Sequence, residues 1–150
     1  MLLMVGTACG LLGATPAAQG ARSTDANIAA SVSVREEGNL HFVRSSGSTL
    51  TDEGPATGKI PGRVKVLFVY NGNPNVSAQI TIYGRSGSIS AHGSATLSSP
   101  TSPNPSFSGT LNVTGGSGRY AHAHGSAKLY GVFHRRSYGM VVQTQGTLHY

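Results

Sequence analysis

The sequence has few charged residues, no tryptophan and a single cysteine. Of its 150 residues 11% are charged, while glycine occurs 21 times. This composition argues against a helical bundle or a coiled coil, which are rich in charged helix formers. The lone cysteine, Cys9, excludes both an intramolecular disulfide and a thiolate zinc site. We therefore expect one domain of all-β architecture that depends on its sheet for stability.

Carboxylates are scarce and unevenly distributed. All five lie before residue 54, at Asp25, Glu36, Glu37, Asp52 and Glu53. A glycosidase pair would have to come from these five, and a calcium site of the acidic-loop kind is excluded. The net charge of +6 comes from basic residues that are scattered singly, apart from Arg135 and Arg136. Because they form no run and do not interleave with aromatic residues, we expect no nucleic-acid partner.

The first residues have the features of an export signal. Residues 2–14 are uniformly apolar or small, a length that suits a signal-peptide core and is too short for a membrane-spanning helix. The tripeptide AQG at 18–20 has the small-x-small form of a cleavage site. We expect residues 1–21 to be removed, which leaves a secreted or extracytoplasmic chain without a stable membrane span. Alternatively, the tetrapeptide GTAC loosely resembles a lipobox and would anchor the chain by a lipid on Cys9.

Short segments of alternating apolar and polar residues follow, separated by clusters of Gly, Pro, Asn and Ser. The pattern predicts an eight-stranded antiparallel β-barrel over residues 22–150, since closure removes exposed strand edges. The predicted strands are 27–36, 40–44, 63–70, 76–83, 88–97, 107–113, 123–133 and 138–149. Residues 45–62 contain almost no large apolar side chain, and we expect them to form a long loop.

Several inward positions of the predicted strands carry small residues. They are Ala91, Gly93, Ala95, Gly109, Gly125, Ala127 and Gly131. An eight-stranded barrel is just wide enough to be filled by side chains or to hold one small ligand. Small residues could leave room for that ligand, or they could serve barrel taper and strand bending in a filled interior. In a filled barrel we expect Phe42, Phe68, Phe107, Phe133 and Met140 to meet in the middle.

Two segments of the second half combine a Gly-rich turn with a strand. The first is VTGGSGRYAHAHGSAKL at 113–129, where a Gly-rich turn leads into a G-x-x-K-L strand. The second is ITIYGRSGSISAHGSATL at 80–97, where an aromatic-Gly-x-x-Gly turn leads into an (I/L)-S-x-x-G strand. Both segments resemble the allene oxide cyclase family and its barrel-like bacterial relatives. The resemblance implies an eight-stranded barrel whose apolar cavity binds a fatty-acid-derived epoxide. It also implies kinship with dirigent proteins and leaves a homo-oligomer open.

The same resemblance implies a catalytic glutamate on the first strand, and Glu36 corresponds to it. Independently, strand alternation places Glu36 on the face of Val32 and Val34, where an apolar interior would raise its pKa and suit it to acid-base chemistry. The alternative is a strand-end carboxylate in solvent or paired with Arg35 or Arg44. The residues expected to line a ligand site around Glu36 are Val34, Phe42, Phe68, Phe107 and Tyr138.

Histidines offer a second candidate chemistry. His122 and His124 are two residues apart, and pairing of Phe133 with Tyr138 would place His149 opposite His122. Three imidazoles could hold Zn, Cu or Ni, although solvated surface histidines explain the same pattern.

We expect no cofactor. We also do not expect a hydrolase, because the sequence has no Gly-x-Ser-x-Gly elbow between a strand and a helix. The function indicated is binding of a small apolar molecule, or its isomerisation or cyclisation. The alternative is a noncatalytic exported interaction module with a filled barrel and a basic outer surface.

Overall fold

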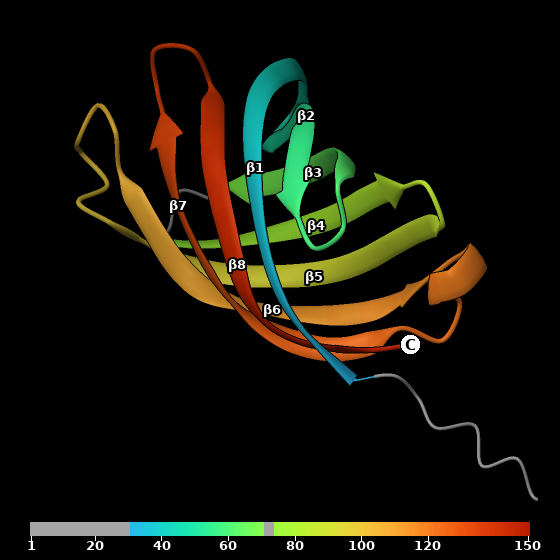
Figure 1. The fold of residues 1–150 in the computed structure, drawn as a ribbon. Coiled ribbons are helices and arrows are strands. Elements are labelled where there is room, and N and C mark those ends of the chain that lie inside the picture. Colours follow the sequence, from blue (N-terminus) through green and yellow to red (C-terminus); the bar gives the residue numbers. More distant parts are fainter. Residues whose placement is uncertain (1–30, 71–73) are drawn as a thin grey trace, which may run out of the picture.

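The protein folds as a closed barrel of eight antiparallel strands, which confirms the predicted fold class (Figure 1). The computed structural model describes residues 31–70 and 74–150. The expected signal segment at 1–21, with Cys9, lies outside the described residues, as does the beginning of the first predicted strand. The strands are β1 (Ser31–Ser46), β2 (Thr49–Gly58), β3 (Gly62–Tyr70), β4 (Asn75–Gly84), β5 (Gly87–Ser98), β6 (Ser106–Gly116), β7 (His124–His134) and β8 (Gly139–His149).

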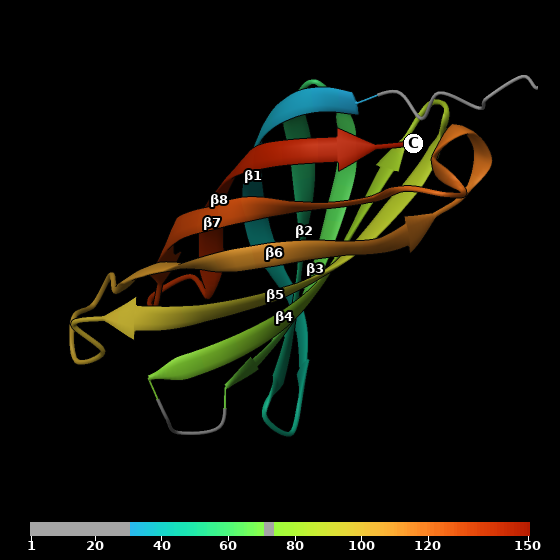
Figure 2. The ribbon, with the colours of Figure 1, turned by 90° about the horizontal axis from the view of Figure 1, so that it is seen from below.

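Each strand pairs with its neighbours in chain order, and β1 pairs with β8 to close the ring. A short 3₁₀ helix, η1 (Gly118–Tyr120), lies between β6 and β7. No helix in the described part of the chain has the length and apolar character needed to cross a membrane. Figure 2 shows the strands inclined to one another and wrapping around a common interior, as barrel closure requires.

The barrel has two different ends. At the end that we call the terminal end, the start of β1 lies beside the C-terminus, because Ser31 pairs with His149 (Figure 1). The β2–β3, β4–β5 and β6–β7 connections lie there as well. At the opposite end, which we call the hairpin end, lie the β1–β2, β3–β4, β5–β6 and β7–β8 connections.

The interior contains two apolar clusters. The larger one fills the middle of the barrel and extends toward the hairpin end, with Val66, Phe68, Phe107, Leu129 and Met140 among its buried members. The smaller one closes the terminal end and is made by Ile60, Ile89, Tyr120, Ala123 and Leu148. Outward positions are mostly polar, as the alternation of the sequence predicts.

The predicted loop at 45–62 is wrong, because these residues contain the whole of β2. The inward positions of β2 are Leu50, Asp52, Gly54 and Ala56, which pair with inward residues of β3 and include only one large apolar side chain. Hydrophobic alternation is therefore absent even though the strand is paired on both sides. Pro55 is tolerated where the β1–β2 register has no partner for it, between the Gly38–Ala56 and His41–Glu53 pairs.

The strands predicted at 27–36 and 40–44 are one strand, since β1 runs without a break through Gly38. Gly38 faces the interior, where a side chain would press against Val64 and Leu40. The glycine therefore marks close packing inside the barrel and not a turn. The predicted count of eight strands is right, although two of the predicted strands merge and one arises from the predicted loop.

Candidate functional site

Glu36 is a buried carboxylic acid on the inward face of β1. Its side chain is 7% exposed, so the inward orientation expected from strand alternation is confirmed. Oε1 accepts a hydrogen bond of 2.8 Å from the backbone N–H of Ile60, in the β2–β3 turn. Oε2 is buried and has no hydrogen-bond partner among the described residues. One carboxyl oxygen is therefore held by the β2–β3 turn, whereas the other is not.

Gly58 makes room for this carboxyl group. It pairs with Glu36 across β1 and β2 and has a φ of +139°. A Cβ at this position would overlap the carbonyl oxygen of Arg35 and Oε2 of Glu36. Only glycine therefore fits both the backbone conformation and the space beside the acid.

Burial raises the pKa of the Glu36 carboxyl above its ordinary value. The hydrogen bond from the Ile60 amide and the nearby backbone amide of Lys59 oppose this shift but do not cancel it. No basic side chain forms an ion pair with Glu36 within the described ranges. The alternative of pairing with Arg35 or Arg44 is therefore wrong, and the acid has a larger neutral fraction than an exposed glutamate at the same pH.

Two small cavities flank Glu36, each of about 40 Å³. They share walls formed by Ile80, Ile82, Leu111 and Thr144, and one of them reaches Val34 at the terminal end. A third cavity of about 20 Å³ lies among Val66, Phe68, Phe107 and Met140. Each can hold water-sized groups, and each is much smaller than the roughly 300 Å³ or more of an ordinary ligand pocket.

Large neighbours fill the space that the small inward residues leave. The missing side chain of Gly131 is replaced by the ring of Phe107, and that of Gly93 by Leu129 and Leu111. At Gly109 the backbone of β5 approaches too closely for any Cβ. In this structure the small residues therefore serve close packing more than an open cavity.

The residues expected to line one site with Glu36 are divided among three places. Val34 lies beside Glu36, and Phe107 lies with Phe68 around the third cavity. Phe42 and Tyr138 are 37% and 51% exposed and contact each other at the hairpin end, with ring centroids 5.6 Å apart. The expectation that Phe42 reaches the middle is wrong, because its inward position falls on the part of β1 that extends beyond β8.

Asp52 is a second buried acid, which the sequence analysis missed because it falls in the segment predicted as a loop. It is fully buried, and neither carboxyl oxygen has a hydrogen-bond partner within the described part of the chain. Burial raises its pKa to about 6, against an opposing effect of His41. The signal available in the sequence was weak: an alternation of Leu50, Asp52 and Ala56 with polar residues.

The predicted convergence of three histidines is wrong. The β7–β8 turn includes Tyr138, so Phe133 pairs with Met140 and His149 lies opposite His124. The two rings stack with centroids 5.0 Å apart, while His122 lies in the preceding turn and only its carbonyl contacts His124. Within residues 31–70 and 74–150, no three metal-binding side chains are grouped.

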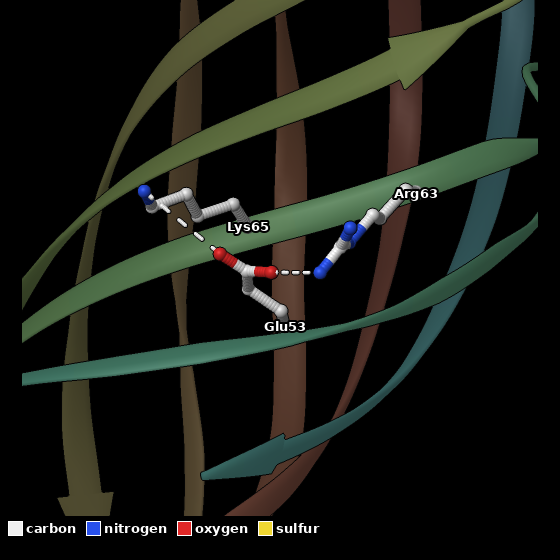
Figure 3. Close-up of polar contacts among 3 residues, drawn as sticks. All are labelled: Glu53, Arg63 and Lys65. Carbon is white, nitrogen blue, oxygen red and sulfur yellow. Dashed lines mark hydrogen bonds and ion pairs between the residues drawn. The ribbon is translucent and has the colours of Figure 1, made fainter. Parts of the chain in front are cut away.

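The outer surface presents a contrasting acid, Glu53 on β2. It forms ion pairs with Arg63 and Lys65 of β3, the Lys65 Nζ–Glu53 Oε1 distance being 3.8 Å (Figure 3). Figure 3 shows all three side chains on the outside of the sheet, pointing toward one another. Glu53 therefore has two cationic partners, whereas the buried acids Glu36 and Asp52 form no ion pair with any described residue.

Comparison with protein-family models, with curated proteins and with solved structures finds no match for this chain.

Proposed function

We propose that this protein is an exported barrel of the allene oxide cyclase-like type, which binds a small apolar molecule through one polar group at Glu36. The observation that carries the proposal is the unpartnered Oε2 of Glu36, buried between two apolar cavities. Leaving a buried polar atom unpaired costs about 1–3 kcal/mol. A ligand hydroxyl or carbonyl at this position would recover that cost.

The same carboxyl can carry acid-base chemistry. In its neutral form it can donate a proton to an epoxide oxygen as a C–O bond breaks, and the resulting carboxylate can accept a proton from carbon afterwards. The atoms of the substrate are then rearranged and none is lost. Such an isomerisation or cyclisation requires no cofactor.

Binding requires rearrangement of the wall between the two cavities. Ile80, Ile82 and Leu111 border both cavities, so rotation of these side chains would join them. Aliphatic side chains have discrete rotamers separated by modest energies, and a ligand that fills the joined space would offset the change.

Native mass spectrometry of the 150-residue chain, offered fatty acids, terpenoids and phenolic compounds in turn, tests the proposal and reports the oligomeric state. We expect a stoichiometric adduct that is lost in Glu36→Gln. Glu53→Gln is the matched control, because it removes an acid from the outer surface that borders neither cavity. An adduct that survives Glu36→Gln unchanged would contradict the assignment of this site. Where Glu36→Gln does abolish the adduct, chiral chromatography of an epoxide substrate tests cyclisation.

The small size of the cavities favours a second candidate, a noncatalytic exported module with a filled interior. Its basic exterior, with a net charge of +6 over the chain, would then contact an anionic partner. Absence of any adduct across the panel would favour this function over ligand binding.

A further inference from the structure

The hairpin end contains a cavity that is separate from Glu36. Its volume is about 130 Å³, larger than each of the three interior cavities described above. The walls are almost entirely apolar, and one arginine, Arg135, is among the residues that form them. The residues that form them are Leu50, Phe68, Tyr70, Leu97, Pro105, Phe133, Arg135 and Tyr138. We call this space the mouth cavity.

The size of the mouth cavity fits one aromatic ring. An apolar cavity of about 150 Å³ lined by similar side chains is enough to bind benzene. Aromatic rings already form part of the walls: Phe68 and Phe133 stack with centroids 6.0 Å apart, and Tyr138 meets Phe133 edge-on at 6.4 Å. A ligand ring would add further aromatic contacts. Such contacts stabilise by more than the burial of apolar area alone accounts for.

Tyr138 is held in a costly conformation at the edge of this cavity. Its φ is +55°, in the left-handed region that residues other than glycine rarely adopt, and the residue is 51% exposed. Such backbone strain is concentrated at functional sites. Phe42, also partly exposed, packs against the same ring.

Arg135 lines the mouth cavity, and its guanidinium group is hydrogen-bonded to the loop between β5 and β6. Its Nε donates to the carbonyl of Ser102 at 3.0 Å, and its Nη2 donates to the carbonyl of Pro100. These bonds use two of the five N–H donors of a guanidinium, so three remain. Both partners are neutral carbonyls, and the ion pairs of the described residues involve only Glu53. The charge of Arg135 is therefore uncompensated.

The hairpin end around Arg135 has an excess of positive charge. Arg44 and Arg136 also belong to the hairpin end, and the outward carboxylates of the described residues, Glu37 and Glu53, have partners on the barrel wall. Asp52 is the acid nearest along β2, two residues from Leu50, but it is not part of the cavity walls. The charge and the shape together favour an anion with an apolar body.

We propose that the mouth cavity binds an aromatic carboxylate, whose single ring packs beside Leu97 and the stacked rings of Phe68 and Phe133 while its carboxylate accepts hydrogen bonds from Arg135. This site lies at the opposite end of the barrel from Glu36 and does not depend on the function proposed there.

Three probes with the same ring and chain test the charge requirement: 3-phenylpropanoate, 3-phenylpropan-1-ol and 3-phenylpropan-1-amine. Titrations of the 150-residue chain are followed by amide NMR shifts. We expect the carboxylate to bind about tenfold more tightly than the alcohol, the size of a charge-assisted hydrogen bond. The shifts should centre on Leu50, Leu97 and Phe133. Equal affinity for all three probes, no binding at millimolar concentration, or shifts centred on Glu36 would overturn the proposal.

Variants separate the roles of charge and cavity. Arg135→Gln should abolish the preference for the carboxylate, whereas Arg136→Gln, which removes the same charge outside the cavity, should retain it. Leu50→Phe should fill the cavity and prevent binding of all three probes without loss of folding. Equal effects of the two arginine variants would contradict the site. If Arg135→Gln does not fold, the comparison of Leu50→Phe with the wild-type chain still decides.

Discussion

Glu36 and Asp52 are both buried on the inner face of the barrel, yet their surroundings differ. Glu36 has a backbone N–H bound to one oxygen and cavities beside the other. Asp52 has no hydrogen-bond partner in the described part of the chain and borders none of the cavities described above. Burial raises the pKa of both carboxyls. A raised pKa alone therefore does not identify a site, and the space beside Glu36 distinguishes the two.

The largest change in stability is expected for Asp52, whose buried carboxyl group has no hydrogen-bond partner among the described residues. Because the folded state raises the pKa of Asp52 from 3.8 to about 6, it binds the proton more tightly than the unfolded state. Stability contributed by the neutral acid is thus present below about pH 4 and is lost as the pH rises through about 6. The loss is about 3 kcal/mol, at 1.36 kcal/mol per pKa unit.

Asp52→Asn should therefore stabilise the protein at neutral pH, by up to about 3 kcal/mol, and should have little effect below about pH 4. Urea unfolding across this pH range measures the difference. A gain in stability that is the same at every pH would show that protonation of Asp52 does not affect the stability of the protein.

An intermediate effect is expected at Glu36, where the acid has one partner. Glu36→Gln retains an oxygen that can accept the Ile60 N–H, whereas Glu36→Ala leaves that N–H unpaired. We expect the alanine variant to be less stable than the glutamine variant by about 1–3 kcal/mol. Urea unfolding of the two variants at one pH tests this, and equal stabilities would mean that the Ile60 hydrogen bond contributes nothing.

The smallest effect is expected at Glu53, on the outside. Arg63, one of its two partners, is 69% exposed, so the ion pairs are screened by solvent. Glu53→Gln should cost less than about 1 kcal/mol, and the difference should shrink in concentrated salt. Thermal unfolding with and without salt provides the measurement. A larger, salt-independent loss would place Glu53 with the buried acids.

The sequence predicted those strands in which large apolar and polar residues alternate. Residues 88–97 fall within β5 because serines and His92 alternate with apolar and small residues there. β2 was missed because three of its four inward positions are acidic or small. The large apolar side chains that cover its inner face belong to neighbouring strands. Local pattern therefore located strands only where a strand supplies its own hydrophobic face.

The candidate site was predicted only in part for a related reason. The inward orientation of Glu36 follows from alternation within one strand, and it was correct. The positions of Phe42, Tyr138 and His149 depend on where a hairpin turns and how far a strand extends past its neighbour. A shift of two residues in the β7–β8 register was enough to replace His122 by His124 opposite His149. Long-range register is a tertiary property that local pattern does not encode.

The pairing of β1 with β8 has a consequence for how the chain folds. The strand that closes the barrel is the last one in the sequence, so its contacts with β1 span nearly the whole domain. Such a topology has a high contact order and is expected to fold slowly. The entropy of closing a long loop is lost before the paired strands stabilise the chain. Until β8 arrives, β1 and β7 both present open edges that can recruit another chain. During synthesis the chain is therefore open to pairing with its own copies until β8 has been made.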